Sequence, residues 1–158
     1  MSYVPVTKEN FEGRNVAAEV KQVKREAIKF MAKVFKSMII PLIDGIAESL
    51  GVDKYTFIRE LIRKGHTIGY LLKIHNVSFT QIVSKIPTQL LALISDVIDK
   101  VKKEDVVRFC DEDLAKVFEE AGEKELAKLI SESELAKAWF TQSIVELYTL
   151  FKKYLRVK

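Results

Sequence analysis

The clearest chemical pattern in the sequence is a set of lysines and arginines between residues 14 and 39. At about 100° per residue of an α-helix, most of this set falls within an arc of roughly 100°. The full set, called here the basic stripe, is Arg14, Lys21, Lys24, Arg25, Lys29, Lys33 and Lys36. Like charges one helical turn apart repel each other, and a negatively charged partner turns that repulsion into attraction. The stripe therefore predicts contact with the phosphates of a nucleic acid.

Two other interpretations of the basic stripe remain open. It could be the solvated face of an ordinary amphipathic helix, or it could bind an anionic membrane surface. The membrane is less favoured, because this helix has no Trp and its valines suit a protein core. A helix of this length reaches close to 40 Å at about 1.5 Å per residue, which is long enough to follow several phosphates. Of the nucleic acids, DNA is favoured over RNA as the ligand.

A second candidate for DNA contact is the segment 46–65, which looks like a helix-turn-helix. Ala47 would let two helices approach closely, Gly51 would make the turn, and Val52, Phe57 and Leu61 would fill the gap between them. Glu60 departs from the pattern, because such motifs usually place an apolar residue there. A plain helical hairpin is the competing interpretation. The groove-facing side chains would be Lys54, Tyr55, Arg59, Arg63 and Lys64.

Other reactive residue types do not form a recognisable site. His66 and His75 are nine residues apart and have no suitably spaced carboxylate, so we expect no metal site. Cys110 precedes three acids, which would raise the pKa of its thiol and weaken it as a nucleophile. The chain has no phosphate-cradling loop, dinucleotide fingerprint or serine elbow. We therefore predict a non-enzymatic protein without cofactor or small-molecule substrate.

The C-terminal segment combines an apolar stripe with a group of cations. Residues of the stripe follow helical spacing and are interpreted as core or subunit interface: Phe140, Ile144, Leu147, Tyr148, Phe151 and Leu155, with Trp139 beside them. The cations Lys152, Lys153, Arg156 and Lys158 stand where positive charge favours a helix C-terminus. On that interpretation they need no ligand.

These residues must be positioned by helices. Only 6 Gly and 3 Pro interrupt a chain in which 48% of residues are hydrophobic, and no alternating run predicts a strand. We predict an all-α protein with an extended N-terminal arm at 1–14, a long basic amphipathic helix at 15–40 and a compact helical bundle at 41–158. The helix and the bundle would form a single domain.

Local signals place the ends of the expected helices. Pro41 should end the first long helix. Asp53 should cap a helix that Gly65 closes, and Ser78 with Gln81 has the spacing of a capping box. Pro87 should bend or break the following helix. The acids at 111–113 should begin another helix, which Gly122 interrupts, and Ser131 or Ser133 should start the last one.

Charge is distributed unevenly along the chain. Residues 1–103 hold 17 Lys/Arg and 10 Asp/Glu, whereas residues 104–137 hold 5 and 11. This asymmetry suggests one face for a polyanion and another for solvent or a basic neighbour. A single Cys and the lack of an apolar signal at 1–12 favour a reducing, intracellular compartment. Low Asn and Gln content beside 30% charged residues is typical of hyperthermophile proteins.

The arrangement of arm, long basic helix and helical bundle resembles the coat proteins of filamentous archaeal viruses. In that family, helical arms wrap the genome and the bundles pack outward. The resemblance covers the whole chain and implies a homo- or heterodimeric DNA packager, located in the virion, which contacts phosphates without reading bases. The alternatives are a helix-turn-helix regulator and a small adaptor subunit of a larger assembly.

Self-association is expected on independent grounds. The apolar side of the first helix carries Val16, Val20, Val23, Ala27, Phe30, Met31 and Val34. It ends in Phe35, Met38 and Ile39 and exceeds what one small bundle covers. An uncovered apolar face of this kind favours a dimer or a higher oligomer.

Overall fold

The protein is entirely helical in the part that its structure describes. The computed structural model describes residues 5–157, and it describes side chains from residue 18 to residue 156. Within residues 5–157 every regular element is a helix and no strand forms. The predicted all-α class is therefore confirmed.

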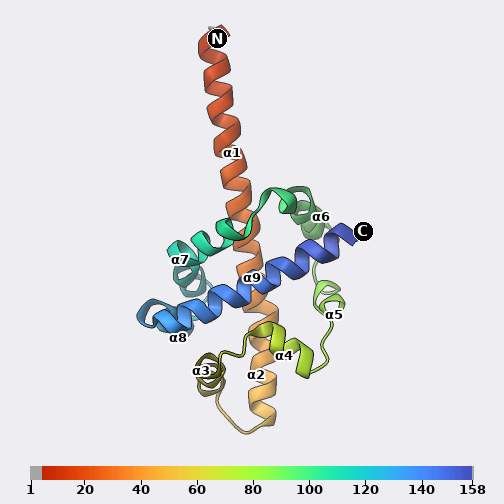
Figure 1. Cartoon of the computed structure of the whole chain (residues 1–158), viewed down its shortest axis with the longest axis vertical. Helices are drawn as coiled ribbons and strands as arrows, with labels where there is room; N and C mark the ends of the chain where they lie inside the picture. The colour runs from red at the N-terminus through yellow and green to blue at the C-terminus, as the bar shows by residue number, and fades with distance from the viewer. Residues whose placement is uncertain (1–4, 158) are drawn as a thin grey trace.

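A long helical rod runs through the molecule. It consists of α1 (Pro5–Val34), the π-helical segment η1 (Phe35–Ile39) and α2 (Ile40–Ser49), which follow one another along nearly one axis (Figure 1). Residues 5–14 are helical, where the sequence predicted an extended arm. Proline is well tolerated in a first helical turn, and an interior glycine such as Gly13 costs only about 1 kcal/mol. Residues 1–4 of the predicted arm lie outside the described residues.

Pro41 does not end the helical path, contrary to the sequence prediction. Proline has no N–H for the carbonyl of Ser37, four residues earlier, and its ring crowds that carbonyl. The π-helical turn absorbs the mismatch, because the N–H of Ile40 donates to the carbonyl of Phe35 and widens the helix by one residue. The backbone at Ile39 and Ile40 stays in the right-handed helical region. The boundary predicted at residue 40 is thus a widened turn inside one rod.

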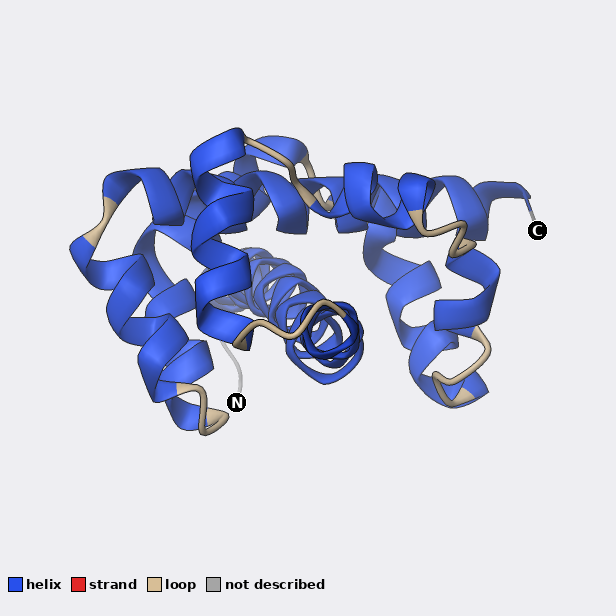
Figure 2. Cartoon of the chain, turned by 90° about the horizontal axis from the view of Figure 1, so that it is seen from below, coloured by secondary structure: helices blue, strands red, loops and turns tan. Residues whose placement is uncertain are grey.

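The remaining helices form the bundle around this rod. They are α3 (Lys54–Lys64), α4 (Ile68–Ile74), α5 (Phe79–Val83), α6 (Thr88–Val97), the short 3-10 segment η2 (Ile98–Lys100), α7 (Lys103–Glu120), α8 (Lys124–Glu132) and α9 (Glu134–Val157). Figure 2 views the rod nearly end-on, with α9 passing across it, helices on either side and one side left uncovered.

Most of the predicted caps are confirmed. Asp53 accepts hydrogen bonds from the amides of Tyr55 and Thr56, and Gly65 closes α3 in the left-handed conformation with φ 71°. Ser78 and Gln81 form the predicted capping box of α5. Backbone chemistry within four residues decides each of these ends, which is why the sequence predicts them.

The predicted start of a helix at Asp111 is wrong. Helix α7 begins at Lys103, because the carboxylate of Asp105 accepts a 2.9 Å hydrogen bond from the amide of Lys102 and satisfies the free helix end. The acids 111–113 therefore lie in the middle of α7. Two of them form ion pairs there: Asp113 with Arg25 and Asp111 with Lys137. Their role is tertiary contact and not the helix N-terminus.

The core joins the rod to α7 and α9 through aromatic side chains. The Phe35 ring is fully buried and lies 6.1 Å from Phe118 and 5.8 Å from Phe140, centroid to centroid. Trp139 packs on both Phe35 and Phe140, and its indole N–H donates to the carbonyl of His66. The apolar stripe predicted on the last helix is buried, except for partly buried Leu155. Its assignment to the core is confirmed.

The buried side of the rod overlaps the predicted apolar side but is shifted around the helix: Ala27, Met31 and Val34 were assigned to it and are buried. Val23 was assigned to the apolar face and is 43% exposed, whereas Ile28 and Ala32, assigned to neither face, are buried. The bundle also covers Phe35 and Ile39, which were expected to remain for a partner. Helix packing against α7 and α9 rotates the buried arc away from the valine-rich edge, so Val23 and half-buried Phe30 stay accessible.

Candidate nucleic-acid interface

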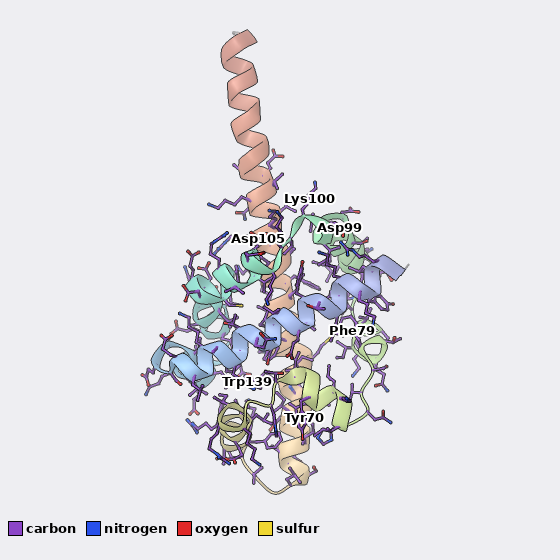
Figure 3. The ribbon with its side chains drawn as sticks, viewed as in Figure 1. Tyr70, Phe79, Asp99, Lys100, Asp105 and Trp139 are labelled. Carbon is purple, nitrogen blue, oxygen red and sulfur yellow. The ribbon has the colours of Figure 1, made fainter. Side chains whose placement is uncertain are left out.

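The basic stripe is divided by helix α7. Lys24 forms an ion pair of 3.5 Å with Asp105, and Arg25 forms one of 2.6 Å with Asp113. Asp105 lies where the chain crosses α1 at the start of α7 (Figure 3). Two of the predicted phosphate contacts are thus turned toward carboxylates of the same chain. Arg14 lies in the part of α1 whose side chains are not described.

The ion pair between Arg25 and Asp113 is shorter than the one between Lys24 and Asp105. The guanidinium of Arg25 also lies over the ring of Phe109, 5.2 Å from its centroid. The hydrogen bond from Arg25 lowers the pKa of the Asp113 carboxyl, outweighing partial burial, and the same bond raises the pKa of Arg25. This pair therefore stays ionised at neutral pH. Exposed pairs contribute about 0–1 kcal/mol to stability, so the contact is replaceable.

Four lysines of the stripe have no such partner. Among the described residues, none of them has a carboxylate within ion-pair distance: Lys21, Lys29, Lys33 and Lys36. Lys21 and Lys33 are exposed, and Lys29 and Lys36 are half-buried. At about 100° per residue these lysines share roughly one third of the helix circumference. The structure thus leaves a row of ammonium groups without ion-pair partners along the rod.

The acidic region of the sequence is the neighbour of the basic helix. Its carboxylates on α7 face Lys24 and Arg25, and Lys54 of α3 pairs with Glu123 at 3.6 Å. The sequence analysis offered a basic neighbour as one explanation of the acidic middle region, and this explanation is correct in part. The remaining positive field lies on the lysines without partners.

The helical hairpin predicted at 46–65 is present. Helices α2 and α3 pack together, Ala47 is fully buried, Gly51 makes the turn with φ 72°, and Leu61 is buried. Val52 was expected between the helices and is instead 40% exposed. The turn residues 50–53 lie at the end of the rod, where little else packs (Figure 1).

Most cations of this hairpin form ion pairs with carboxylates of the same chain. Glu60, the residue that departs from the helix-turn-helix pattern, pairs with Arg63 and lies 3.8 Å from Lys64. Its carboxylate therefore faces solvent and not the core. Lys54 is held by Glu123. Arg59 is exposed, and within the described part of the chain it has no carboxylate partner.

His66 and Cys110 take part in packing, whereas His75 lies on the surface. The ring of His66 stacks on Tyr70 at 4.0 Å, and His75 is exposed. Cys110 is buried, and burial raises the pKa of its thiol to about 12. The direction matches the sequence prediction, but the cause is desolvation and not the neighbouring acids. No group of three or more His, Cys, Asp or Glu suited to a metal ion occurs among the described residues.

Sequence analysis missed a groove beside the lysine row. It lies between α1 and α6, has a volume of about 480 Å³, and is lined by apolar side chains that include Val23, Phe30, Leu90 and Leu93. Lys29 and Lys33 border it together with Glu26 and Asp96. Leu93 is 62% exposed. The apolar run at 90–94 is only partly covered in α6, because Ile94 is buried whereas Leu90 and Leu93 are exposed.

Comparison with known proteins gives no family for this chain. No family model, no curated protein and no solved structure matches it. In addition, the described helices are all too short or too polar to cross a bilayer. A functional proposal must therefore rest on the arrangement of the side chains themselves.

Proposed function

We propose that this protein is a non-enzymatic nucleic-acid-binding protein that coats or organises DNA through non-specific phosphate contacts. The observation that carries the proposal is the row of four lysines on α1 and η1 without carboxylate partners. In a chain with 22 acids, leaving this row unpaired maintains a local positive field. A packaging role like that of the coat proteins of filamentous archaeal viruses agrees with the projection of α1 beyond the bundle (Figure 1).

The row fits the spacing of a nucleic-acid backbone. From Lys21 to Lys36 the helix rises roughly 22 Å, and one DNA strand carries a phosphate about every 3.4 Å along the duplex axis. Lysines are flexible point charges that contact phosphates without reading bases. The row therefore predicts similar affinity for any duplex sequence, and an affinity that falls steeply with salt.

The test is the salt dependence of duplex binding. Each Lys–phosphate contact contributes about 0.9 to the slope of log K against log salt. We expect Lys21→Gln, Lys29→Gln, Lys33→Gln and Lys36→Gln each to flatten that slope by about that amount, on any duplex sequence. Fluorescence anisotropy with two unrelated duplexes across a salt series measures it. The matched controls are Lys124→Gln and Lys128→Gln, two exposed lysines of α8.

Two outcomes would overturn the proposal. One is wild-type protein that binds neither duplex nor single strand at low salt. The other is equal slopes for the α1 variants and the α8 controls, which would make the row an ordinary solvated surface. Circular dichroism of each variant establishes that the fold is retained.

A helix-turn-helix function is the second candidate, and exposed Arg59 favours it. If α3 reads bases, Arg59→Ala should cost about 1–3 kcal/mol on one preferred site and little on random DNA. We expect equal small losses on both, because Lys54, Arg63 and Lys64 are engaged by carboxylates of the chain. A large loss on one sequence alone would favour the regulator over the packager.

We infer that self-association uses the groove between α1 and α6 and that a second copy of this chain occupies it. The groove exposes Leu90, Leu93 and Val23. The same apolar patch on a second copy can pack against it across a two-fold axis, which leaves Lys29 and Lys33 at the border. An adaptor role would instead place a different protein in this groove.

A further inference from the structure

A second basic surface lies away from the lysine row of α1. It is a hollow of about 590 Å³ between the start of α7 and the last turns of α9. Its charged lining consists of Lys102, Lys103, Glu104, Lys152, Lys153 and Arg156. The sequence interpretation assigned the last three cations to the C-terminus of a helix, where they need no ligand. Their convergence with Lys102 and Lys103 depends on α7 and α9 packing together, and the sequence does not show it.

The charge of this hollow is far from balanced. Five cations and one carboxylate line it, a net +4, and counting Asp99, which pairs with Arg156, leaves +3. A neighbouring hollow along α7 and α9 has three cations and three carboxylates, and the ion pair of Lys137 with Asp111 lies in it. Both hollows lie between the same two helices. The excess of positive charge is therefore specific to this hollow and is not a general feature of the surface along α7 and α9.

Nearby carboxylates do not neutralise the lysines. Asp105 is the closest acid in sequence after Glu104, and it is committed to Lys24, Arg108 and the amide of Lys102. Asp99 pairs with Arg156 (Figure 3 labels Asp99). Within the described residues, the four lysines of the hollow have no carboxylate at ion-pair distance. Like charges held in one concavity repel unless an anion joins them.

One lysine is held in place by the core. Lys152 is half-buried, and its Nζ donates a 3.2 Å hydrogen bond to the hydroxyl oxygen of Tyr148. Tyr148 is buried, and its own hydroxyl donates to the carbonyl of Val101 at 2.6 Å. This chain of hydrogen bonds links α9 to Val101, two residues before α7 begins. The Lys152 ammonium is therefore fixed at the hollow, which lowers the entropy lost on binding.

We propose that this hollow is a binding site for a phosphate-bearing anion. Several ammonium groups around one concavity suit the dispersed negative charge of phosphate oxygens. The phosphate belongs either to a free polyphosphorylated small molecule or to a nucleic-acid backbone that reaches this face. The site is distinct from the lysine row of α1 and does not depend on it.

Inorganic tripolyphosphate is the probe for this site. Isothermal titration calorimetry of the full chain at low salt should show one saturable site. Lys152→Gln combined with Lys153→Gln should weaken that affinity by about tenfold or more, because two charge-assisted contacts are lost. The control double variant Lys124→Gln with Lys128→Gln should leave it unchanged. Absence of saturable binding, or equal weakening in both double variants, would overturn the proposal.

Duplex binding by the same variants identifies the source of the phosphate. If the double variant Lys152→Gln with Lys153→Gln binds tripolyphosphate more weakly and also has a flatter salt slope for duplex binding, the hollow contacts the nucleic-acid backbone. If this variant binds tripolyphosphate more weakly and keeps the wild-type salt slope for duplex binding, the ligand is a free phosphorylated molecule. Variants of the α1 row should retain tripolyphosphate binding. The proposal for the hollow and the proposal for the α1 row can therefore fail independently of each other.

Discussion

Arg25 shows how a single cation can serve either the fold or a ligand. Its guanidinium contacts Asp113 and the ring of Phe109, yet 45% of the side chain remains exposed. A phosphate approaching α1 would compete with the Asp113 carboxylate for the same donors. Because exposed ion pairs contribute only about 0–1 kcal/mol, that exchange costs little. Arg25 is therefore a member of the basic stripe that Asp113 masks, in the sense that this carboxylate competes with a phosphate for the guanidinium.

Removal of the competing carboxylate should unmask it. We expect Asp113→Asn to steepen the slope of log K against log salt for duplex DNA by about 0.9, one additional phosphate contact. Unfolding free energy should change by about 1 kcal/mol or less. Anisotropy titrations across a salt series and urea denaturation measure the two effects.

The matched control for this prediction is Asp111→Asn. Asp111 lies on the same helix and also forms an ion pair, but its partner is Lys137 of α9 and not a residue of the stripe. Its substitution should leave the slope unchanged. If Asp113→Asn does not steepen the slope, Arg25 does not reach a phosphate.

For single residues, the sequence predicted which cations share one face of α1 better than it predicted which carboxylates pair with them. The periodicity of α1 is local and identifies its cations directly. Their pairing with acids is not local, since Arg25 and Asp113 are 88 residues apart. Whether a cation is free depends on which face of α7 packs against the rod. No spacing rule gives that, so the division of the stripe could not be predicted.

Among the elements, the rod is held to the bundle by its π-helical segment. Phe35 begins η1, is fully buried and contacts the rings of Phe118, Trp139 and Phe140. Burial of a phenylalanine side chain stabilises a fold by about 1.5–3 kcal/mol, and its truncation also leaves a cavity. The widened turn thus places the central anchor of the rod.

Truncation of this anchor should destabilise the whole domain. We expect Phe35→Ala to lower the free energy of unfolding by about 3–5 kcal/mol in urea denaturation followed by circular dichroism. Phe30→Ala is the control on the same rod, because Phe30 is half-buried beside the groove and should cost clearly less. Equal losses for the two variants would mean that the rod is not anchored through η1.

Helix ends were predictable where chemistry within one turn decides them. Asp53, Gly65 and Ser78 act on amides or carbonyls a few residues away, and each was assigned correctly. Pro41 was misassigned because a π-turn offers a way to continue that the local rule ignores. The acids 111–113 satisfied the rule for a helix start, but α7 already begins at Lys103 and tertiary ion pairs explain them.

The whole molecule divides into a covered and an uncovered side of one rod. The bundle covers Phe35 and Ile39, so the interface predicted from those residues is not available. What remains accessible is the groove with Val23, Leu90 and Leu93. The lysine row runs along the border of this groove through Lys29 and Lys33. A dimer formed there would bring the rows of two copies near each other and double the number of phosphate contacts on one duplex.

Disruption of the groove should therefore dissociate the protein and leave its fold intact. We expect sedimentation equilibrium at tens of micromolar to show a dimer for the wild type and a monomer for Leu93→Glu, because a carboxylate in an apolar interface loses hydration without gaining a partner. Leu135→Glu is the matched control: Leu135 of α9 is also 62% exposed, as Leu93 is, but lies outside the groove, so the dimer should persist. The Leu93→Glu monomer should also bind duplex with a shallower salt slope, since fewer phosphates are neutralised per complex. A wild-type monomer under these conditions, with and without DNA, would exclude a second copy as the occupant of the groove.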